Sequence, residues 1–141
     1  MNPNNVDKII LHHSLTKDSG TVSTGAIRDY HININHWSDI GYHFLIENLR
    51  GQTEIVAGRM LDKTGAHTKG HNRNSIGICF VGNFDIVPPP GEAWVQGAKL
   101  VRFLMKQYGI KKVVGHTELN PHKTCPGRMF DLDKFRNDVG L

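Results

Sequence analysis

The sequence predicts a single-domain α/β fold in which helices cover both faces of a central mixed β-sheet. Short runs of aliphatic, often β-branched residues alternate along the chain with amphipathic stretches at helical spacing. One pair of expected strands is separated by a short turn that contains glycine, which indicates an antiparallel hairpin. A chain of 141 residues suits one hydrophobic core, and no repeat or change in composition divides it. We therefore expect one domain over residues 1–141.

The expected strands are short, and two of them end in histidine. The first begins with the apolar run Ile9–Leu11 and ends at His12 and His13, whereas the last delivers His116. Ligands in α/β folds collect at the ends of strands, so adjacent placement of these two strands would bring two imidazoles together at one rim of the sheet. The expected strands cover 8–14, 42–48, 53–57, 76–81 and 112–115.

Three helices are expected between and after these strands. The first begins at Ser23 or Thr24, which are good N-cap residues, and closes near Trp37. The second follows the run Pro88–Pro90 and ends at Gly109, and its apolar stripe is typical of a core-facing helix. The third is short and covers about 131–138. The apolar positions of the first helix are Ile27, Tyr30 and Ile34, and those of the second are Trp94, Gly97, Ala98, Val101, Leu104, Met105 and Tyr108.

The composition raises the question of a metal and excludes several other classes. Nine histidines accompany only two cysteines, so a disulfide framework is excluded. The net charge of +4 is scattered along the sequence, which does not favour a nucleic-acid partner. No apolar run approaches the length of a membrane span, and the N-terminus lacks the pattern of a signal peptide. We therefore expect synthesis in the cytoplasm and no stable membrane insertion.

A candidate zinc site can be assembled from two histidines and a cysteine. Catalytic zinc sites use about three nitrogen, sulfur or oxygen ligands from the protein. His116 and either His12 or His13 are candidates, because adjacent residues on a strand point to opposite faces and only one of the two can reach the rim. Cys125 lies in a proline-bordered loop beside Lys123, where we expect an accessible thiol in surroundings that favour the thiolate.

Several runs of residues resemble a known family in content and in order. They lie at 9–14, 27–31, 41–46, 65–79, 115–118 and 123–127. Over nearly the whole chain, they are similar to the N-acetylmuramoyl-L-alanine amidases of the phage-lysozyme and peptidoglycan-recognition-protein type. The resemblance implies a zinc-dependent enzyme that hydrolyses the amide bond between the lactyl group of N-acetylmuramic acid and the L-alanine of the stem peptide.

The resemblance also implies roles for individual residues. The family's zinc ligands fall on His12, His116 and Cys125, so the resemblance selects His12 over His13. The family's catalytic residues fall on Tyr42 and Lys123. The loop 65–75 is expected to form a wall of the substrate groove, and its candidate substrate-binding residues are His67, Asn72 and Arg73. Glu118 is a candidate base, a partner of a ligand imidazole or an exposed loop residue, and we favour one of the last two.

The expected protein is a phage or prophage endolysin, a monomer that acts on the peptidoglycan of the cell wall after release from the cytoplasm. One alternative is a cytosolic amidase that recycles soluble anhydro-muropeptides, but the compact chain lacks the loop insertions usual in such enzymes. A second is a peptidoglycan-binding module without catalysis, which the presence of Tyr42, Lys123 and Cys125 disfavours. A third is a metal-free hydrolase with Cys125 as nucleophile and His116 as base.

Overall fold

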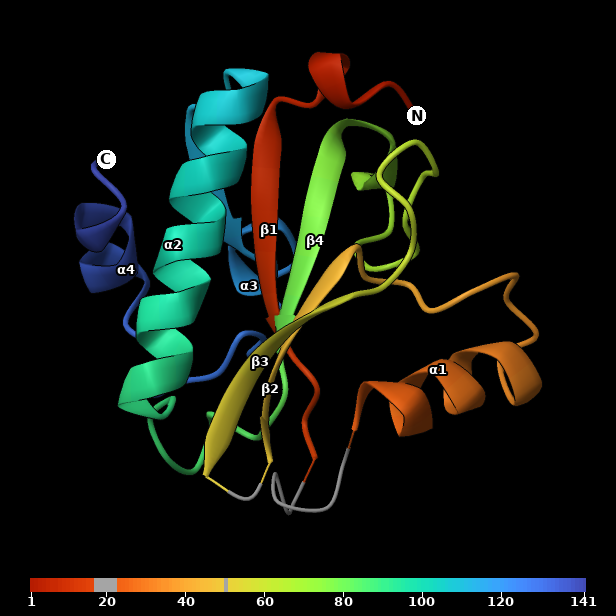
Figure 1. Ribbon diagram of the computed structural model, residues 1–141, viewed down its shortest axis with the longest axis horizontal. Helices are drawn as coiled ribbons and strands as arrows, with labels where there is room; N and C mark the ends of the chain where they lie inside the picture. Colours follow the sequence, from red (N-terminus) through yellow and green to blue (C-terminus); the bar gives the residue numbers. More distant parts are fainter. Residues whose placement is uncertain (17–22, 50) are drawn as a thin grey trace.

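A five-stranded mixed sheet forms the centre of the molecule (Figure 1). The computed structural model describes residues 1–16, 23–49 and 51–141. The strand order is β3-β2-β4-β1-β5; β2 and β3 are antiparallel, and the remaining neighbours are parallel. The strands are β1 (Lys8–His13), β2 (Phe44–Leu49), β3 (Gln52–Ala57), β4 (Ser75–Phe80) and β5 (Lys112–Gly115). All five expected strands and the hairpin are confirmed, although Arg50 in its turn lies outside the described residues.

Helices lie on both sides of this sheet, as the sequence predicts. In Figure 1, α2 and α4 are on one side and α1 is on the other. A four-residue helix, α3, follows β5 directly in a segment that was expected to be a loop. The helices are α1 (Thr24–Asn33), α2 (Gly91–Tyr108), α3 (His116–Leu119) and α4 (Leu132–Asp138), with short 3-10 helices at Pro3–Asn5 and Asn72–Asn74. None of the described helices is long and apolar enough to cross a membrane.

The larger part of the core lies between the sheet and α2. The helix buries Ala98, Val101 and Leu104 from its expected stripe, and they join β-sheet residues such as Ile9 and Phe80 in one cluster. Burial of each large apolar side chain of this kind contributes roughly 1.5–3 kcal/mol. A smaller cluster of Ile40, Leu45, Cys79 and Val81 has Ile27 and Tyr42 packed against it. The two clusters make the sheet a rigid base for residues at its edge.

The helix α1 buries fewer apolar side chains than its sequence pattern predicts. Ser23 is the N-cap, and its hydroxyl accepts a hydrogen bond from the Ala26 N–H; the helix ends at Asn33 rather than near Trp37. Tyr30 and Ile34 are 55% and 60% exposed, so only Ile27 of the apolar face packs against a core cluster. Tyr30 instead lines a hollow of about 310 Å³ that Tyr42 also lines. The face of α1 therefore contributes to a surface hollow rather than to the core.

Candidate metal and catalytic site

Parallel pairing of β1 with β5 brings two histidines to the same edge of the sheet. Leu11 lies opposite Gly115 in the register, so the next residue on each segment is a histidine, His12 or His116. The centroids of their rings are 4.8 Å apart. Cys125 joins them from the loop after α3, and its Sγ lies 3.5 Å from His12 Nδ1. One ligand atom from each of the three residues can be chosen so that all lie within 4.8 Å of one another.

The position of Cys125 is fixed by backbone contacts on both sides of its loop. Its Sγ accepts a hydrogen bond from the His13 N–H, and its carbonyl oxygen accepts one from the Thr117 N–H. Asp85 adds two further contacts, because its carboxylate accepts hydrogen bonds from the Thr124 hydroxyl and from the Arg128 N–H. The loop is thus tied to β1, to α3 and to the segment after β4.

The expectation of an accessible, electropositive thiol at Cys125 is wrong. The residue is only 8% exposed, because its loop folds back onto the end of β1. Burial and, to a smaller extent, the negative charge of Asp85 raise the pKa of the thiol to about 12, because the hydrogen bond from the His13 N–H and the charge of Lys123 offset only part of their effect. In the absence of a metal, Cys125 is therefore protonated at neutral pH.

His12 is buried and neutral, the form in which an imidazole binds a metal. Burial lowers the pKa of His12 well below its usual range, and the neighbouring imidazoles lower it further. His13 points elsewhere, since its Nδ1 accepts a hydrogen bond from the Phe84 N–H. Burial also lowers the pKa of His116, and the nearby charge of Lys123 acts in the same direction.

Tyr42 and Lys123 lie at the rim of this cluster. The ring centroid of Tyr42 is 5.2 Å from that of His12. Burial raises the pKa of Tyr42 well above its usual value, so its hydroxyl remains a proton donor at neutral pH. Lys123 is exposed, two residues before Cys125. The two side chains offer one neutral hydrogen-bond donor and one positive charge beside the three candidate ligands.

The three candidate substrate-binding residues of the loop 65–75 have different surroundings. The His67 ring reaches His12, with 2.9 Å between His67 Nδ1 and His12 Nε2. The Asn72 side chain holds the loop, because its carbonyl oxygen accepts hydrogen bonds from the N–H groups of His67 and Thr68. Arg73 is exposed at the surface.

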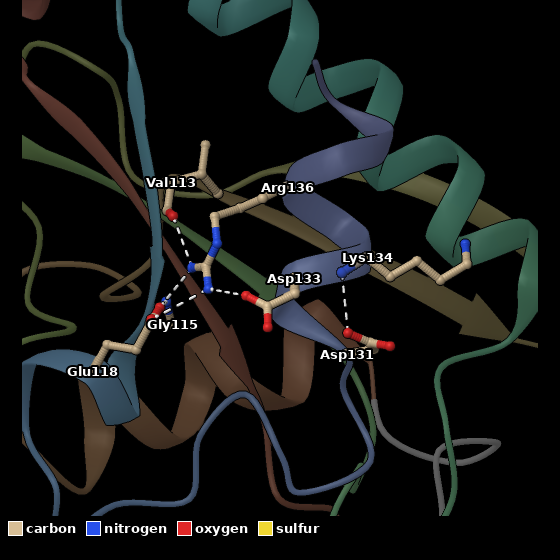
Figure 2. A network of polar contacts seen from close by, with 7 residues as sticks. All are labelled: Val113, Gly115, Glu118, Asp131, Asp133, Lys134 and Arg136. Carbon is tan, nitrogen blue, oxygen red and sulfur yellow. Dashed lines mark hydrogen bonds and ion pairs between the residues drawn. The ribbon is translucent and has the colours of Figure 1, made fainter. Parts of the chain in front are cut away.

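The Glu118 carboxylate reaches Arg136 of α4 (Figure 2). Its carboxylate accepts hydrogen bonds from the Gly115 N–H at 2.8 Å and from Arg136 Nη1 at 2.7 Å. The same guanidinium donates to the Val113 carbonyl oxygen and to Asp133. These contacts leave the carboxylate poorly placed to act as a base, and they tie the start of α3 to the C-terminal helix. Arg136 could not be recognised from the sequence, because nothing in the spacing links it to Glu118.

Comparisons with known proteins identify the family of this chain. The family model described as N-acetylmuramoyl-L-alanine amidase matches residues 2–128. The endolysin of Escherichia phage T7 is 37% identical over 135 residues, covering 92% of this chain and 84% of the endolysin. The endolysin of Klebsiella phage KP32 is 35% identical, covering 91% and 83%.

Solved structures of similar proteins share the fold. The endolysin and amidase LysCS from Clostridium intestinale superposes with a TM-score of 0.86 at 26% identity, covering 99% of this chain and 88% of that one. A mutant of Drosophila PGRP-LB in complex with tracheal cytotoxin has a TM-score of 0.74 at 26% identity, covering 89% and 77%. The chain therefore belongs to the N-acetylmuramoyl-L-alanine amidase family. It is a peptidoglycan amidase.

Proposed function

We propose that this amidase is zinc-dependent and that His12, His116 and Cys125 hold the metal. The observation that carries the proposal is the convergence of two imidazoles and a thiol at one edge of the sheet, with their ligand atoms within 4.8 Å of one another. Two nitrogen donors and one sulfur donor suit zinc, and three protein ligands leave a position open. The separation of 3.5 Å between Cys125 Sγ and His12 Nδ1 is compatible with two zinc ligands.

When bound, zinc supplies Lewis acidity to the scissile carbonyl and lowers the pKa of a bound water toward about 7. The catalytic residues of the chain itself are Tyr42 and Lys123. The Tyr42 hydroxyl, kept protonated by burial, donates a hydrogen bond to the amide oxygen of the substrate. Lys123 places a positive charge where negative charge develops during attack on that carbonyl.

The substrate-binding side of the proposal rests on the loop 65–75. The exposed Arg73 guanidinium is available to pair with a carboxylate of the stem peptide. Asn72 holds the loop that presents Arg73, and His67 lies beside His12. The substrate is a muramyl-peptide of peptidoglycan, and no nucleic acid takes part.

The setting that fits best is that of a phage or prophage endolysin. The curated relatives include endolysins of several bacteriophages. As proposed, the chain is made in the cytoplasm, reaches the cell wall after release and acts as a monomer. The alternative is a recycling enzyme that takes soluble anhydro-muropeptides, and the choice of substrate separates the two.

One assay tests these proposals together. Purified protein is incubated with sacculi and, separately, with soluble anhydro-muropeptide, each with and without a chelator, and the newly released peptide amino groups are quantified. We expect release from sacculi that stops when zinc is removed and returns when zinc is added back. Preference for the soluble substrate would identify a recycling enzyme, and release that resists the chelator would favour a cysteine hydrolase.

A further inference from the structure

We propose that His67 is a positioning residue that fixes the tautomer and the orientation of the ligand His12. The inference rests on the proposed zinc site and deepens it. A histidine that binds a metal through one ring nitrogen usually donates its other N–H to a fixed acceptor, and such partners orient the ligand. For His12 that acceptor is the imidazole of His67.

The distances assign a direction to the hydrogen bond between the two rings. Nδ1 of His12 faces Cys125 Sγ at 3.5 Å, so Nδ1 is the atom that must be free of a proton when a metal is held. The proton of the neutral ring is then on Nε2, which lies 2.9 Å from His67 Nδ1. His12 Nε2 donates and His67 Nδ1 accepts. The Thr68 hydroxyl oxygen lies 3.1 Å from His67 Nδ1 and 3.3 Å from His12 Nε2, beside the same contact.

The far side of the His67 ring is consistent with this direction. If His67 Nδ1 accepts, the neutral ring carries its proton on Nε2, and that nitrogen lies 3.4 Å from the Ser75 hydroxyl oxygen. The Ser75 hydroxyl donates in turn to the carbonyl oxygen of His71 at 2.7 Å. The donors on His12 Nε2, His67 Nε2 and the Ser75 hydroxyl then each meet an acceptor. The opposite tautomer of His67 would set two N–H groups against each other at 2.9 Å.

Two glycines make room for the His67 ring in this position. Gly77 lies in the buried strand β4, where glycine is unfavourable, and a Cβ there would come within 2.6 Å of His67 Cγ. A Cβ on Gly65 would come within 2.6 Å of His67 Cδ2. The Asn72 carbonyl oxygen also fixes the backbone N–H of His67 at 3.0 Å. The two glycines therefore border the ring closely, and Asn72 holds the backbone that carries it.

The test uses a matched pair of variants at His67. His67→Asn places a carbonyl oxygen near the position of Nδ1 and so keeps an acceptor, whereas His67→Leu has a similar size and no acceptor. His122→Ala, in an exposed loop, is the control. Zinc affinity is measured by competition with a chromogenic chelator, and cobalt(II) is substituted to record the thiolate charge-transfer and ligand-field absorption bands.

We expect His67→Leu to weaken zinc binding about 10–100-fold and to alter the ligand-field bands of cobalt. His67→Asn is expected to restore most of the affinity, and His122→Ala to leave it unchanged. Equal zinc affinities for His67→Leu and His67→Asn, whether both at the wild-type level or both weakened, would overturn the inference. If the wild-type protein itself retains no zinc and shows no thiolate band, the proposed zinc site is wrong. That outcome is distinguishable from a failure of the His67 inference alone, in which the wild type binds zinc.

A second measurement uses the wild-type protein, so its result does not depend on whether a variant folds. In the metal-free wild-type protein at neutral pH, the 15N chemical shifts of the histidine rings report which nitrogen carries the proton. We expect protonated Nε2 and unprotonated Nδ1 on both His12 and His67. A proton on Nδ1 of His12 would overturn the inference.

Discussion

Of the three proposed zinc ligands, Cys125 is the one whose protonation state must change when the metal binds. Burial raises the pKa of its thiol to about 12, and burial also keeps the imidazoles of His12 and His116 neutral. A metal requires the thiolate and neutral imidazoles. At pH 7 to 8 the histidines are ready to bind, so the only proton that must leave is that of Cys125.

We therefore predict that zinc binding at pH 7.5 releases about one proton and that the affinity rises about tenfold per pH unit. Titration calorimetry in buffers with different ionisation enthalpies measures the number of protons. Cys125→Ser should bind zinc much more weakly, release no proton and lose the amidase activity. Zinc binding by the wild type without proton release would contradict the assignment of the thiol.

The roles proposed for Tyr42 and Lys123 predict loss of turnover without loss of the proposed zinc. Tyr42→Phe removes the hydroxyl donor, and Lys123→Ala removes the positive charge. Removal of one such group usually lowers kcat by about 10²–10³-fold. Zinc content, measured by elemental analysis, should stay at the wild-type level in both. Tyr108→Phe, which removes a hydroxyl from α2 outside the site, is the control and should keep full activity.

At the scale of elements, the C-terminal helix secures the segment that carries His116. Figure 2 shows Arg136 of α4 reaching the carbonyl oxygen of Val113 in β5 and the carboxylate of Glu118 in α3. Glu118 in turn holds the N–H of Gly115, the residue just before His116. One guanidinium thus joins three elements, which a lysine cannot do because its ammonium lacks the planar fork.

Arg136→Ala is expected to lower the free energy of unfolding by about 1–2 kcal/mol, because it removes several charge-assisted hydrogen bonds at a partly buried site. Lys134→Ala is the control on the same helix; its exposed ammonium pairs with Asp138 and lies over the Trp94 ring, and solvent screening makes these contacts weaker than those of Arg136. Urea unfolding of the metal-free proteins measures both. Equal losses for the two variants would contradict a special role for Arg136.

At the scale of the whole molecule, the histidines couple stability to pH. Burial lowers the pKa of six of them in the folded protein: His12, His13, His31, His43, His67 and His116. Below about pH 6.5, the unfolded chain binds protons that the folded chain excludes. The stability that these residues contribute is therefore complete above about pH 6.5 and is lost as the pH falls.

We predict that the free energy of unfolding of the metal-free protein falls steeply between about pH 6.5 and 5. Each histidine that stays neutral in the fold contributes up to about 1.4 kcal/mol per pH unit in this range. Urea unfolding at a series of pH values measures the slope. His122→Ala, at an exposed position, should leave the slope unchanged. A flat profile from pH 7 to pH 5 would contradict the prediction.

The sequence by itself determined the order and type of most elements. Apolar runs and helical periodicity are local properties, so the five strands, α2 and α4 follow from them. The resemblance of several motifs, in the same order along the chain, indicated the family. The helix α3 was missed because four residues carry too little periodicity. The resemblance also named the candidate ligands, whereas spacing alone left His12 and His13 as alternatives.

Only the tertiary structure decided how the site residues meet and what state they are in. His12 and His116 are far apart in sequence, and the parallel register of β1 and β5 joins them. The burial of Cys125 and the contact of His67 with His12 depend on loops that fold back across the sheet. Protonation and solvent exposure are set by every neighbour in space, and a linear pattern does not contain those neighbours.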